Sequence, residues 1–341
     1  MIHTHEYIWL DGNSPQLLRS KTLVTGSPTA GVWNFDGSST RQSEGDSADL
    51  VIKPVSTVKD PLRENGHLHM CEVFEQDGET PHESNTRATL RGILDDGGHS
   101  LKPWIGFEQE YTLQTPDKSH IYGWPENGAP LTPQGPYYCG VGPAQIQGRN
   151  LVEAHLKACI DAGIQIYGVN AEVMLSQWEF QIGPRKVTEF TSLLTICDHL
   201  WLARWLLFRI GEDFGAEPSL DVKPVDGDWN GAGMHTNFST EATRAEGGYE
   251  KIQEVIPVLE SRHQQHIGLY GQDLHKRLTG LHETCDINTF KSGKSDRGSS
   301  IRIPNHVSQD GKGYFEDRRP GANANPYDVA RLLTEACLEA K

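Results

Sequence analysis

The stretch at residues 106–111, GFEQEY, places two carboxylates two positions apart inside an apolar and aromatic run. In a β-strand, residues i and i+2 point to the same face, so Glu108 and Glu110 are expected to lie side by side. Two anions held this close repel each other unless a cation or a shared proton lies between them. One such pair can also be a solvated strand face. Oxygen ligands of this kind suit magnesium or manganese.

Two further glutamates have apolar neighbours in the sequence, at residues 170–174, NAEVM, and 177–183, QWEFQIG. If a tight turn at Leu175 and Ser176 joins two short strands, Glu172 falls directly opposite Glu179, because both are equally far from the turn. The spacing therefore predicts a second acidic pair on one face.

Two later segments add a histidine and another glutamate. Residues 230–237, NGAGMHTN, combine a glycine-rich turn with an alternating strand that projects His235 and Asn237 to one side. Residues 313–320, GYFEDRRP, place Glu316 and Arg318 on one face in the same way. Five glutamates and one histidine are enough to hold two or three hard divalent ions, with water and substrate oxygens completing each shell.

A set of arginines accompanies these acidic segments: Arg277, Arg297, Arg302 and Arg318. Guanidinium groups bind carboxylates and phosphates through paired hydrogen bonds. Taken singly, each arginine is more often a surface or ion-pair residue. Beside a metal cluster, they indicate a polyphosphate and an acidic substrate lying across the ions, as in phosphoryl transfer.

Together these motifs resemble glutamine synthetase, and specifically its shorter, eukaryotic-like type II class. The resemblance covers nearly the whole chain in the family's order, and it extends to residues 6–12, 33–40, 135–142 and 278–284 as well as to the segments above. Asn237 stands where the long bacterial class usually carries a second histidine, which favours type II. The resemblance implies ATP-dependent ligation of ammonia to the γ-carboxylate of L-glutamate through a γ-glutamyl phosphate, giving L-glutamine, ADP and phosphate for nitrogen assimilation.

The resemblance also implies a role for each site residue. The ligands of the metal nearer the glutamate and ammonium sites would be Glu110, Glu172 and Glu179. Those of the metal at the nucleotide phosphates would be Glu108, His235 and Glu316. The glutamate substrate would be held by Arg277 and Arg318, with Asn230, Gly231 and His235 beside it. The ATP phosphates would be neutralised by Arg297 and Arg302, of which Arg297 would also serve catalysis. Asp36 would bind ammonium and take its proton, and Glu283 would close the site as part of a flap.

The fold expected from the resemblance is α+β. A small N-terminal β-grasp domain, residues 1–82, would precede a larger catalytic domain, residues 83–341, whose antiparallel strands form a partly open barrel around the metals. Apolar periodicity predicts helices at 85–95, 149–162, 188–213, 247–269 and 326–340. The family forms homo-oligomers, so a decamer of two pentameric rings is expected, with Asp36 acting on a neighbouring chain's cluster.

Composition narrows the possible partners and location. The chain has 46 acidic and 31 basic residues, a net charge of −15, which argues against nucleic acid or anionic membrane as a partner. The apolar run at 193–210 contains charged residues and therefore reads as a core helix, not a membrane span. The first residues lack the pattern of a secretory signal, and six scattered cysteines are expected to be reduced, which favours the cytoplasm.

Two other functions fit parts of the pattern. One is a ligase that joins glutamate to an amine or polyamine instead of ammonia. Retention of Asp36 favours ammonium, since a bulkier amine needs a wider and less acidic pocket. The other is an inactive family member with a structural or regulatory role, which would lack metal ligands that are all present here. Trp124-Pro125 and Tyr137-Tyr138 could line an adenine pocket or serve packing.

Overall fold

The computed structural model describes residues 1–125, 132–185 and 192–340. The strands are β1 His3–Leu10, β2 Leu18–Thr25, β3 Trp33–Asp36, β4 Asp49–Lys59, β5 Gly66–Phe74, β6 Trp104–Gln114, β7 Ile166–Ala171, β8 Gln177–Ile182, β9 Glu217–Ser219, β10 Met234–Ser239, β11 Ser292–Lys294, β12 Ile301–Ile303 and β13 Phe315–Asp317. The α-helices are α1 Thr86–Asp95, α2 Arg149–Ala162, α3 Leu193–Phe214, α4 Glu241–Arg244, α5 Gly248–Ser261, α6 His263–Ile267, α7 Leu274–Arg277, α8 Asn305–Asp310 and α9 Pro326–Glu339. Short 3-10 helices are η1 Gly37–Thr40, η2 Gly45–Ser47 and η3 Gly98–Leu101.

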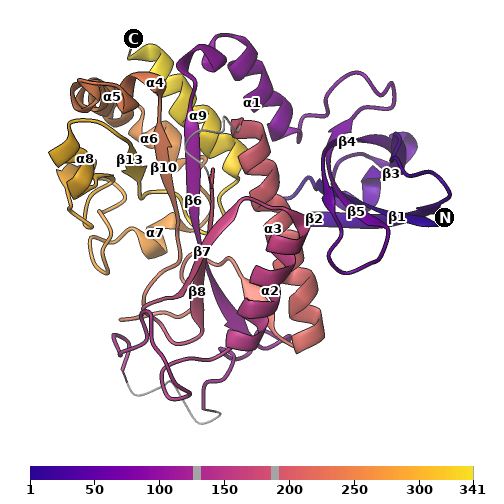
Figure 1. The fold of residues 1–341 in the computed structure, drawn as a ribbon, viewed down its shortest axis with the longest axis horizontal. Coiled ribbons are helices and arrows are strands. Elements are labelled where there is room, and N and C mark those ends of the chain that lie inside the picture. The colour runs from indigo at the N-terminus through magenta and orange to yellow at the C-terminus, as the bar shows by residue number, and fades with distance from the viewer. Residues whose placement is uncertain (126–131, 186–191, 341) are drawn as a thin grey trace.

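The first five strands form one sheet in the order β2-β1-β5-β4-β3, drawn in indigo at one side of the molecule in Figure 1. Side chains alternate across it, as the strand period requires. Ile8, Leu68 and Met70 face the main hydrophobic core, while Tyr7 and Trp9 belong to a separate small core on the other face. Because both faces are apolar, this sheet is anchored to the rest of the chain and also builds its own core.

Four histidines share the second face of this sheet: His3 and His5 on β1, and His67 and His69 on β5. Their ring centroids are spaced 5.1 to 6.4 Å apart along the cluster. His5 Nε2 must donate to the Ser27 carbonyl at 3.0 Å, since a carbonyl only accepts. His5 Nδ1 lies 3.0 Å from His69 Nε2, and His69 Nδ1 lies 2.9 Å from the Thr57 hydroxyl. These contacts link β1, β5 and β4 through the buried rings of His5 and His69.

We expect acid to loosen this N-terminal sheet. Burial, followed by the charges of His5 and His67, lowers the pKa of His69 from 6.5 to about 4. The unfolded chain therefore takes up a proton at this residue more readily than the folded chain. The contribution of His69 to the free energy of unfolding is complete above pH 6.5 and is lost as the pH falls towards 4. Lowering the pH from 7.5 to 5.5 should reduce the free energy of unfolding by about 1 kcal/mol through the protonation of His69 in the unfolded chain.

Urea unfolding at the two pH values, followed in parallel for His69→Gln, measures this contribution. The variant should show a flatter pH dependence than the unmodified chain. Equal slopes for the two proteins would mean that His69 does not titrate as its surroundings indicate.

The second sheet holds eight strands in the order β11-β12-β13-β10-β6-β8-β7, with β9 also pairing with β6. All its pairs are antiparallel except β11 with β12. The sheet curls into a half-barrel, and β6 runs through the middle of it in Figure 1. The expected α+β fold with a partly open barrel of antiparallel strands is confirmed.

The helix that supports this sheet, α3, begins and ends where its sequence directs. The Ser192 side chain caps it by accepting from the Thr195 amide at 3.2 Å, and Gly215 ends it with a φ of 60°. Its predicted start at residue 188 lies outside the described residues. Both sides of α3 are largely buried, so it forms the centre of the main core.

The predicted single helix over residues 247–269 is wrong. The structure divides this segment into α5 and α6 at Arg262, which has φ −93° and ψ 7°. The Arg262 guanidinium lies 3.1 Å from Glu335 and 3.0 Å from Glu339, both on α9. These ion pairs with α9 hold Arg262 at the point where α5 ends, although the apolar periodicity of the sequence continues beyond it.

Two of the sequence-based expectations about the chain's surroundings can be compared with the structure. No helix in the described part of the chain is long and apolar enough to cross a membrane. All six cysteines are free thiols, and all except Cys139 are buried. The expectation of unpaired, mostly buried cysteines is confirmed.

Candidate active site

Strand β6 places the two glutamates of the GFEQEY stretch at the centre of a cavity of about 590 Å³. Neighbouring strands bring His235 and Glu179 to them. On one side, His235 of β10 pairs with Glu108. On the other side, Glu179 of β8 pairs with Glu110. The register of three antiparallel strands therefore assembles residues that lie far apart in the sequence.

The predicted pairing of Glu172 with Glu179 across a two-residue turn was wrong. Asn170 lies opposite Glu179, and the Glu172 amide donates to the carbonyl of Gln177 at 2.9 Å. The turn holds four residues, because Gln177 N donates to Met174 O at 3.0 Å and Ser176 adopts a left-handed φ of 73°. Glu172 reaches the site from the turn, and the strand pair that joins two carboxylates is Glu110 with Glu179.

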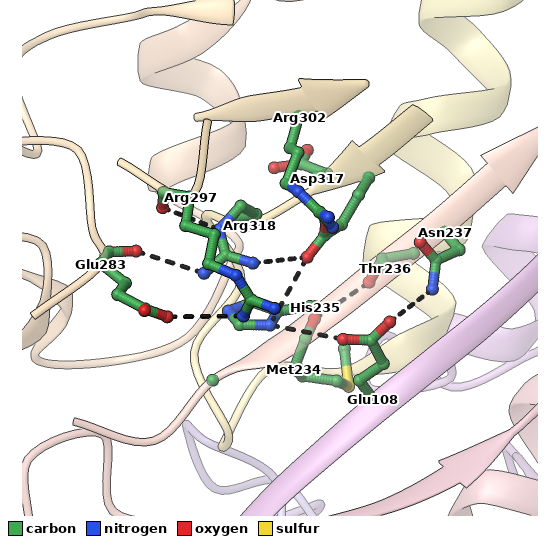
Figure 2. A network of polar contacts seen from close by, with 12 residues as sticks. Glu108, Met234, His235, Thr236, Asn237, Glu283, Arg297, Arg302, Asp317 and Arg318 are labelled. Carbon is green, nitrogen blue, oxygen red and sulfur yellow. Dashed lines mark hydrogen bonds and ion pairs between the residues drawn. The ribbon is translucent and has the colours of Figure 1, made fainter. Parts of the chain in front are cut away.

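The acidic side chains gather in two groups, and the ligand atoms of each group lie within 4.8 Å of one another. One group contains Glu110, Glu172 and Glu179, all buried. The other contains Glu108, His235 and Glu316. Figure 2 shows His235 beside Glu108 and Arg318. His235 Nδ1 lies 3.6 Å from Glu108 Oε2 and 3.7 Å from Glu316 Oε1.

Burial and mutual repulsion make the charged state of the first group unfavourable. Burial, followed by the charges of Glu108, Glu110 and Glu172, raises the pKa of Glu179 to about 9. Burial and Glu110 raise the pKa of Glu172 to about 8. A divalent cation would remove this penalty, since it neutralises the carboxylates that burial and repulsion otherwise protonate.

The donor set therefore fits divalent metal ions. Its carboxylate oxygens are the ligands that magnesium and manganese prefer, and one imidazole is compatible with manganese. Burial, followed by the charge of Arg318, keeps the pKa of His235 well below its usual value, so the ring is neutral as a ligand must be.

All four predicted arginines line the same cavity. Arg318 Nη1 donates to Glu316 Oε1 and Arg302 Nη1 donates to Glu316 Oε2, each at 2.6 Å. Arg277 is buried, and its Nη2 lies 3.0 Å from His235 Nε2. Figure 2 shows Arg297 directed towards Glu283, and the two form an ion pair at 3.5 Å.

The glycines before His235 allow Arg277 to approach. A Cβ at Gly231 would lie 2.7 Å from Arg277 Cγ, and a Cβ at Gly233 would lie 2.4 Å from Arg277 Nη2. The Gly233 amide also donates to Glu110 Oε2 at 2.5 Å. The predicted glycine-rich turn thus holds both an arginine and a carboxylate against the backbone.

Two loop residues that were expected at the substrate also line the cavity: Asn230 and Glu283. Gln134 Nε2 donates to Asn230 Oδ1 at 2.8 Å. Glu283 and the preceding His282 both have left-handed φ values, 59° and 51°, which are uncommon for residues other than glycine. The Glu283 carbonyl accepts from Arg318 and the Glu283 carboxylate pairs with Arg297, and these contacts hold the loop at the site.

Asp36 is the one predicted site residue outside the cavity of its own chain. It ends β3 and caps η1, accepting from Ser38 Oγ at 2.6 Å and Ser39 Oγ at 2.7 Å. These two hydroxyl bonds lower the pKa of the exposed Asp36 carboxyl below its ordinary value, so it remains an anion.

Known proteins match this chain over nearly its whole length. A family model described as glutamine synthetase, catalytic domain, matches residues 83–249. A chloroplastic glutamine synthetase of Chlamydomonas reinhardtii is 52% identical over 98% of this chain and 90% of its own length. The chain belongs to the glutamine synthetase family. A dog glutamine synthetase is 51% identical over 97% of this chain and 89% of its own, and such relatives place the chain in the eukaryotic-like type II class.

A solved structure shares the glutamine synthetase fold. The structure described as apo GmaS without ligand superposes with a TM-score of 0.77 at 18% identity, over 98% of this chain and 77% of that chain. At this identity the likeness supports the fold alone.

Sequence reasoning missed a second cavity in this glutamine synthetase family member. It has a volume of about 230 Å³ and is lined by Trp104, Ile105, Gly106, Tyr167, Gly183, Pro184, Asn237, Ser239 and Tyr314. Asn237 connects it to the acidic site, because Asn237 Nδ2 donates to Glu108 Oε1 at 2.8 Å. The sequence signal for it was the placement of Asn237 on the same strand face as His235.

The aromatic residues at positions 124, 137 and 138 do not line the second cavity. Trp124 packs on Trp229 with ring centroids 4.7 Å apart, and Tyr137 is buried. These two side chains serve packing. Tyr138 instead lines the acidic cavity.

Proposed function

We infer that this chain catalyses the ATP-dependent ligation of ammonia to L-glutamate, giving L-glutamine, ADP and phosphate. The observation that carries this inference is the gathering of two acidic groups and four arginines in one cavity of a glutamine synthetase fold. A γ-carboxylate is a poor electrophile. Transfer of the ATP γ-phosphoryl group to it forms a γ-glutamyl phosphate, whose phosphate is then displaced by ammonia.

In this proposal Glu110, Glu172 and Glu179 hold one Mg²⁺ or Mn²⁺ ion, and Glu108, His235 and Glu316 hold another. Bound there, the metals would supply positive charge to the phosphoryl oxygens and to the substrate carboxylate. The chain's own contribution is to hold Glu108, Glu110, Glu179 and His235 in register, because adjacent antiparallel strands carry them.

The arginines bind the two anionic substrates. Arg277 and Arg318 orient glutamate, with Asn230, Gly231 and His235 beside it. Arg297 and Arg302 stabilise the phosphates, where charge develops during transfer. Arg318 and Arg302 are pre-organised for this role because Glu316 fixes both guanidinium groups.

Ammonium capture falls to a neighbouring subunit. The exposed, anionic Asp36 lies outside its own chain's cavity, which supports a site completed by another chain's N-terminal unit, residues 1–82. Asp36 attracts ammonium and accepts its proton, which frees the nucleophile. Glu283 closes the loop over the acyl phosphate and excludes water. We propose a homodecamer of two pentameric rings, and we place it in the cytoplasm on the strength of the free, mostly buried cysteines.

The second cavity is proposed to hold the ATP nucleoside, since aromatic side chains flank it and Asn237 joins it to Glu108. Tyr167→Ala should raise the KM for ATP roughly tenfold through lost ring contact. The half-exposed position of Tyr167 makes this change mild for folding. Steady-state kinetics should show an unchanged KM for glutamate, and a rise in the glutamate KM alone would place the nucleoside elsewhere.

The test of the function is formation of ADP and glutamine from glutamate, ATP and Mg²⁺, with ammonium, ethylamine, a diamine or no amine. Ammonium-dependent glutamine is the expected result. Turnover only with an organic amine would assign the chain to the amine ligases. No turnover from an assembled, metal-loaded sample would favour a structural or regulatory role.

A further inference from the structure

Behind the acidic site lies a buried cation that the proposed chemistry does not use. Arg204 is on α3 and is completely buried. Among the described residues, no carboxylate forms an ion pair with it, and burial lowers its pKa to about 9. Burying an unpaired guanidinium is costly, so its hydrogen bonds must compensate for the loss of water.

Those hydrogen bonds converge on the reverse side of the ligand-bearing strands. Arg204 Nε donates to Gln109 Oε1 at 2.8 Å, and Nη2 lies 2.5 Å from the same oxygen. Gln109 lies between Glu108 and Glu110 but points to the opposite face of β6. Nη2 also lies 3.2 Å from Met234 Sδ, and Met234 pairs with Gln109 and precedes His235.

The same guanidinium fixes the segment that follows β13. Arg204 Nη2 donates to the carbonyls of Ala322 at 3.1 Å and Ala324 at 3.0 Å. Gln109 Nε2 completes the link by donating to Ala322 O at 3.1 Å and to Glu110 O at 2.8 Å. Arg204 therefore contacts β6, β10 and the 320–324 segment at one point, while the opposite face of these strands carries the metal ligands.

We propose that Arg204, acting through Gln109, is a positioning residue that holds the ligand-bearing strands β6 and β10 in the register that metal binding needs. This inference rests on the proposed function, because it assumes that the acidic groups bind metal. A planar guanidinium can bridge a side-chain amide and two carbonyls at fixed angles, which a lysine ammonium cannot do. Outer partners of this kind typically change metal affinity ten- to a hundredfold when removed.

The experiment measures Mn²⁺ binding to the metal-free oligomer by electron paramagnetic resonance, in parallel with thermal unfolding without metal. The variants are Arg204→Met, Gln109→Leu and the double substitution. Leu202→Ala serves as the control, because it truncates a buried side chain on another face of the same helix. Both single variants should bind Mn²⁺ roughly ten- to a hundredfold more weakly, and the double variant scarcely more weakly than either.

Three outcomes would contradict the proposal. Mn²⁺ affinity in Arg204→Met equal to that of the unmodified chain, or reduced no more than in Leu202→Ala, would reduce Arg204 to a packing role. Additive losses in the double variant would show that Arg204 does not act through Gln109. If Arg204→Met does not fold, Gln109→Leu carries the same expectation alone. Absence of Mn²⁺ binding by the unmodified chain would instead overturn the proposed metal sites, and this inference with them.

Discussion

The Glu179→Gln substitution is expected to lower glutamine synthesis at least about a hundredfold and, at the same time, to stabilise the metal-free protein. Activity falls because one anionic ligand of the buried group is lost. Stability rises because burial and neighbouring carboxylates raise the pKa of Glu179 to about 9, so keeping this group ionised opposes folding. A structural carboxylate would give losses in both measurements.

The sign of this effect depends on pH. The folded pKa of Glu179 lies above the unfolded value of 4.5, so its unfavourable contribution grows as the pH rises from 4.5 towards 9. At pH 7.5 the free energy of unfolding in urea should be at least about 1 kcal/mol higher for the variant than for the unmodified chain. The two free energies should converge near pH 4.5. Saturating Mg²⁺ should reverse the order, because the unmodified chain gains more from binding.

Glu217→Gln on β9 is the matched control, since Glu217 pairs with Lys118 outside the cavity. It should change neither activity nor the effect of Mg²⁺ appreciably. If Glu179→Gln kept its turnover, or lost stability without metal, the acidic group would not be a metal site.

Mixing two inactive variants is expected to restore activity if the site is shared between subunits. Asp36→Asn removes the ammonium-binding carboxylate, and Glu110→Gln removes a metal ligand from the cavity. Each homogeneous oligomer should lose at least about a hundredfold in turnover. In randomly mixed oligomers, about a quarter of the sites combine an intact cluster with an intact Asp36, so about a quarter of the activity should return.

A mixture of Glu110→Gln with Glu179→Gln is the control, because both changes damage the same chain's cavity and no intact site can form. Native mass spectrometry with size-tagged chains confirms that mixing took place. Mixed Asp36→Asn and Glu110→Gln oligomers that remain inactive would contradict a shared site.

Much of the candidate site could be predicted because it depends on strand periodicity. The two-residue spacing of Glu108 and Glu110, and that of His235 and Asn237, fixed which side chains share a face before any pairing was known. The structure places Glu108, Glu110 and His235 in one cavity, and Asn237 donates to Glu108 from its edge.

Features that depend on tertiary contacts were harder to predict from the sequence. The register of the β7–β8 hairpin depends on Ser176, which adopts a left-handed φ. The sequence alone does not predict this conformation for a serine. The second cavity combines residues from β6, β7, β10, the segment after β8 and the segment before β13, and no local pattern joins them. Arg204 looked like an ordinary charged residue of a core helix, because its partners Gln109 and Ala322 lie about a hundred positions away on either side.

Transfer of oxygen from glutamate to phosphate tests the central claim most directly. Glutamate labelled with ¹⁸O in its γ-carboxylate is incubated with the chain, ATP, ammonium and Mg²⁺, and the phosphate and glutamine are analysed by mass spectrometry. A γ-glutamyl phosphate places one carboxylate oxygen in the bridge to phosphorus, so one labelled oxygen should appear in phosphate for each glutamine formed. Glutamine formed together with unlabelled phosphate, or ATP hydrolysis without glutamine, would contradict the account.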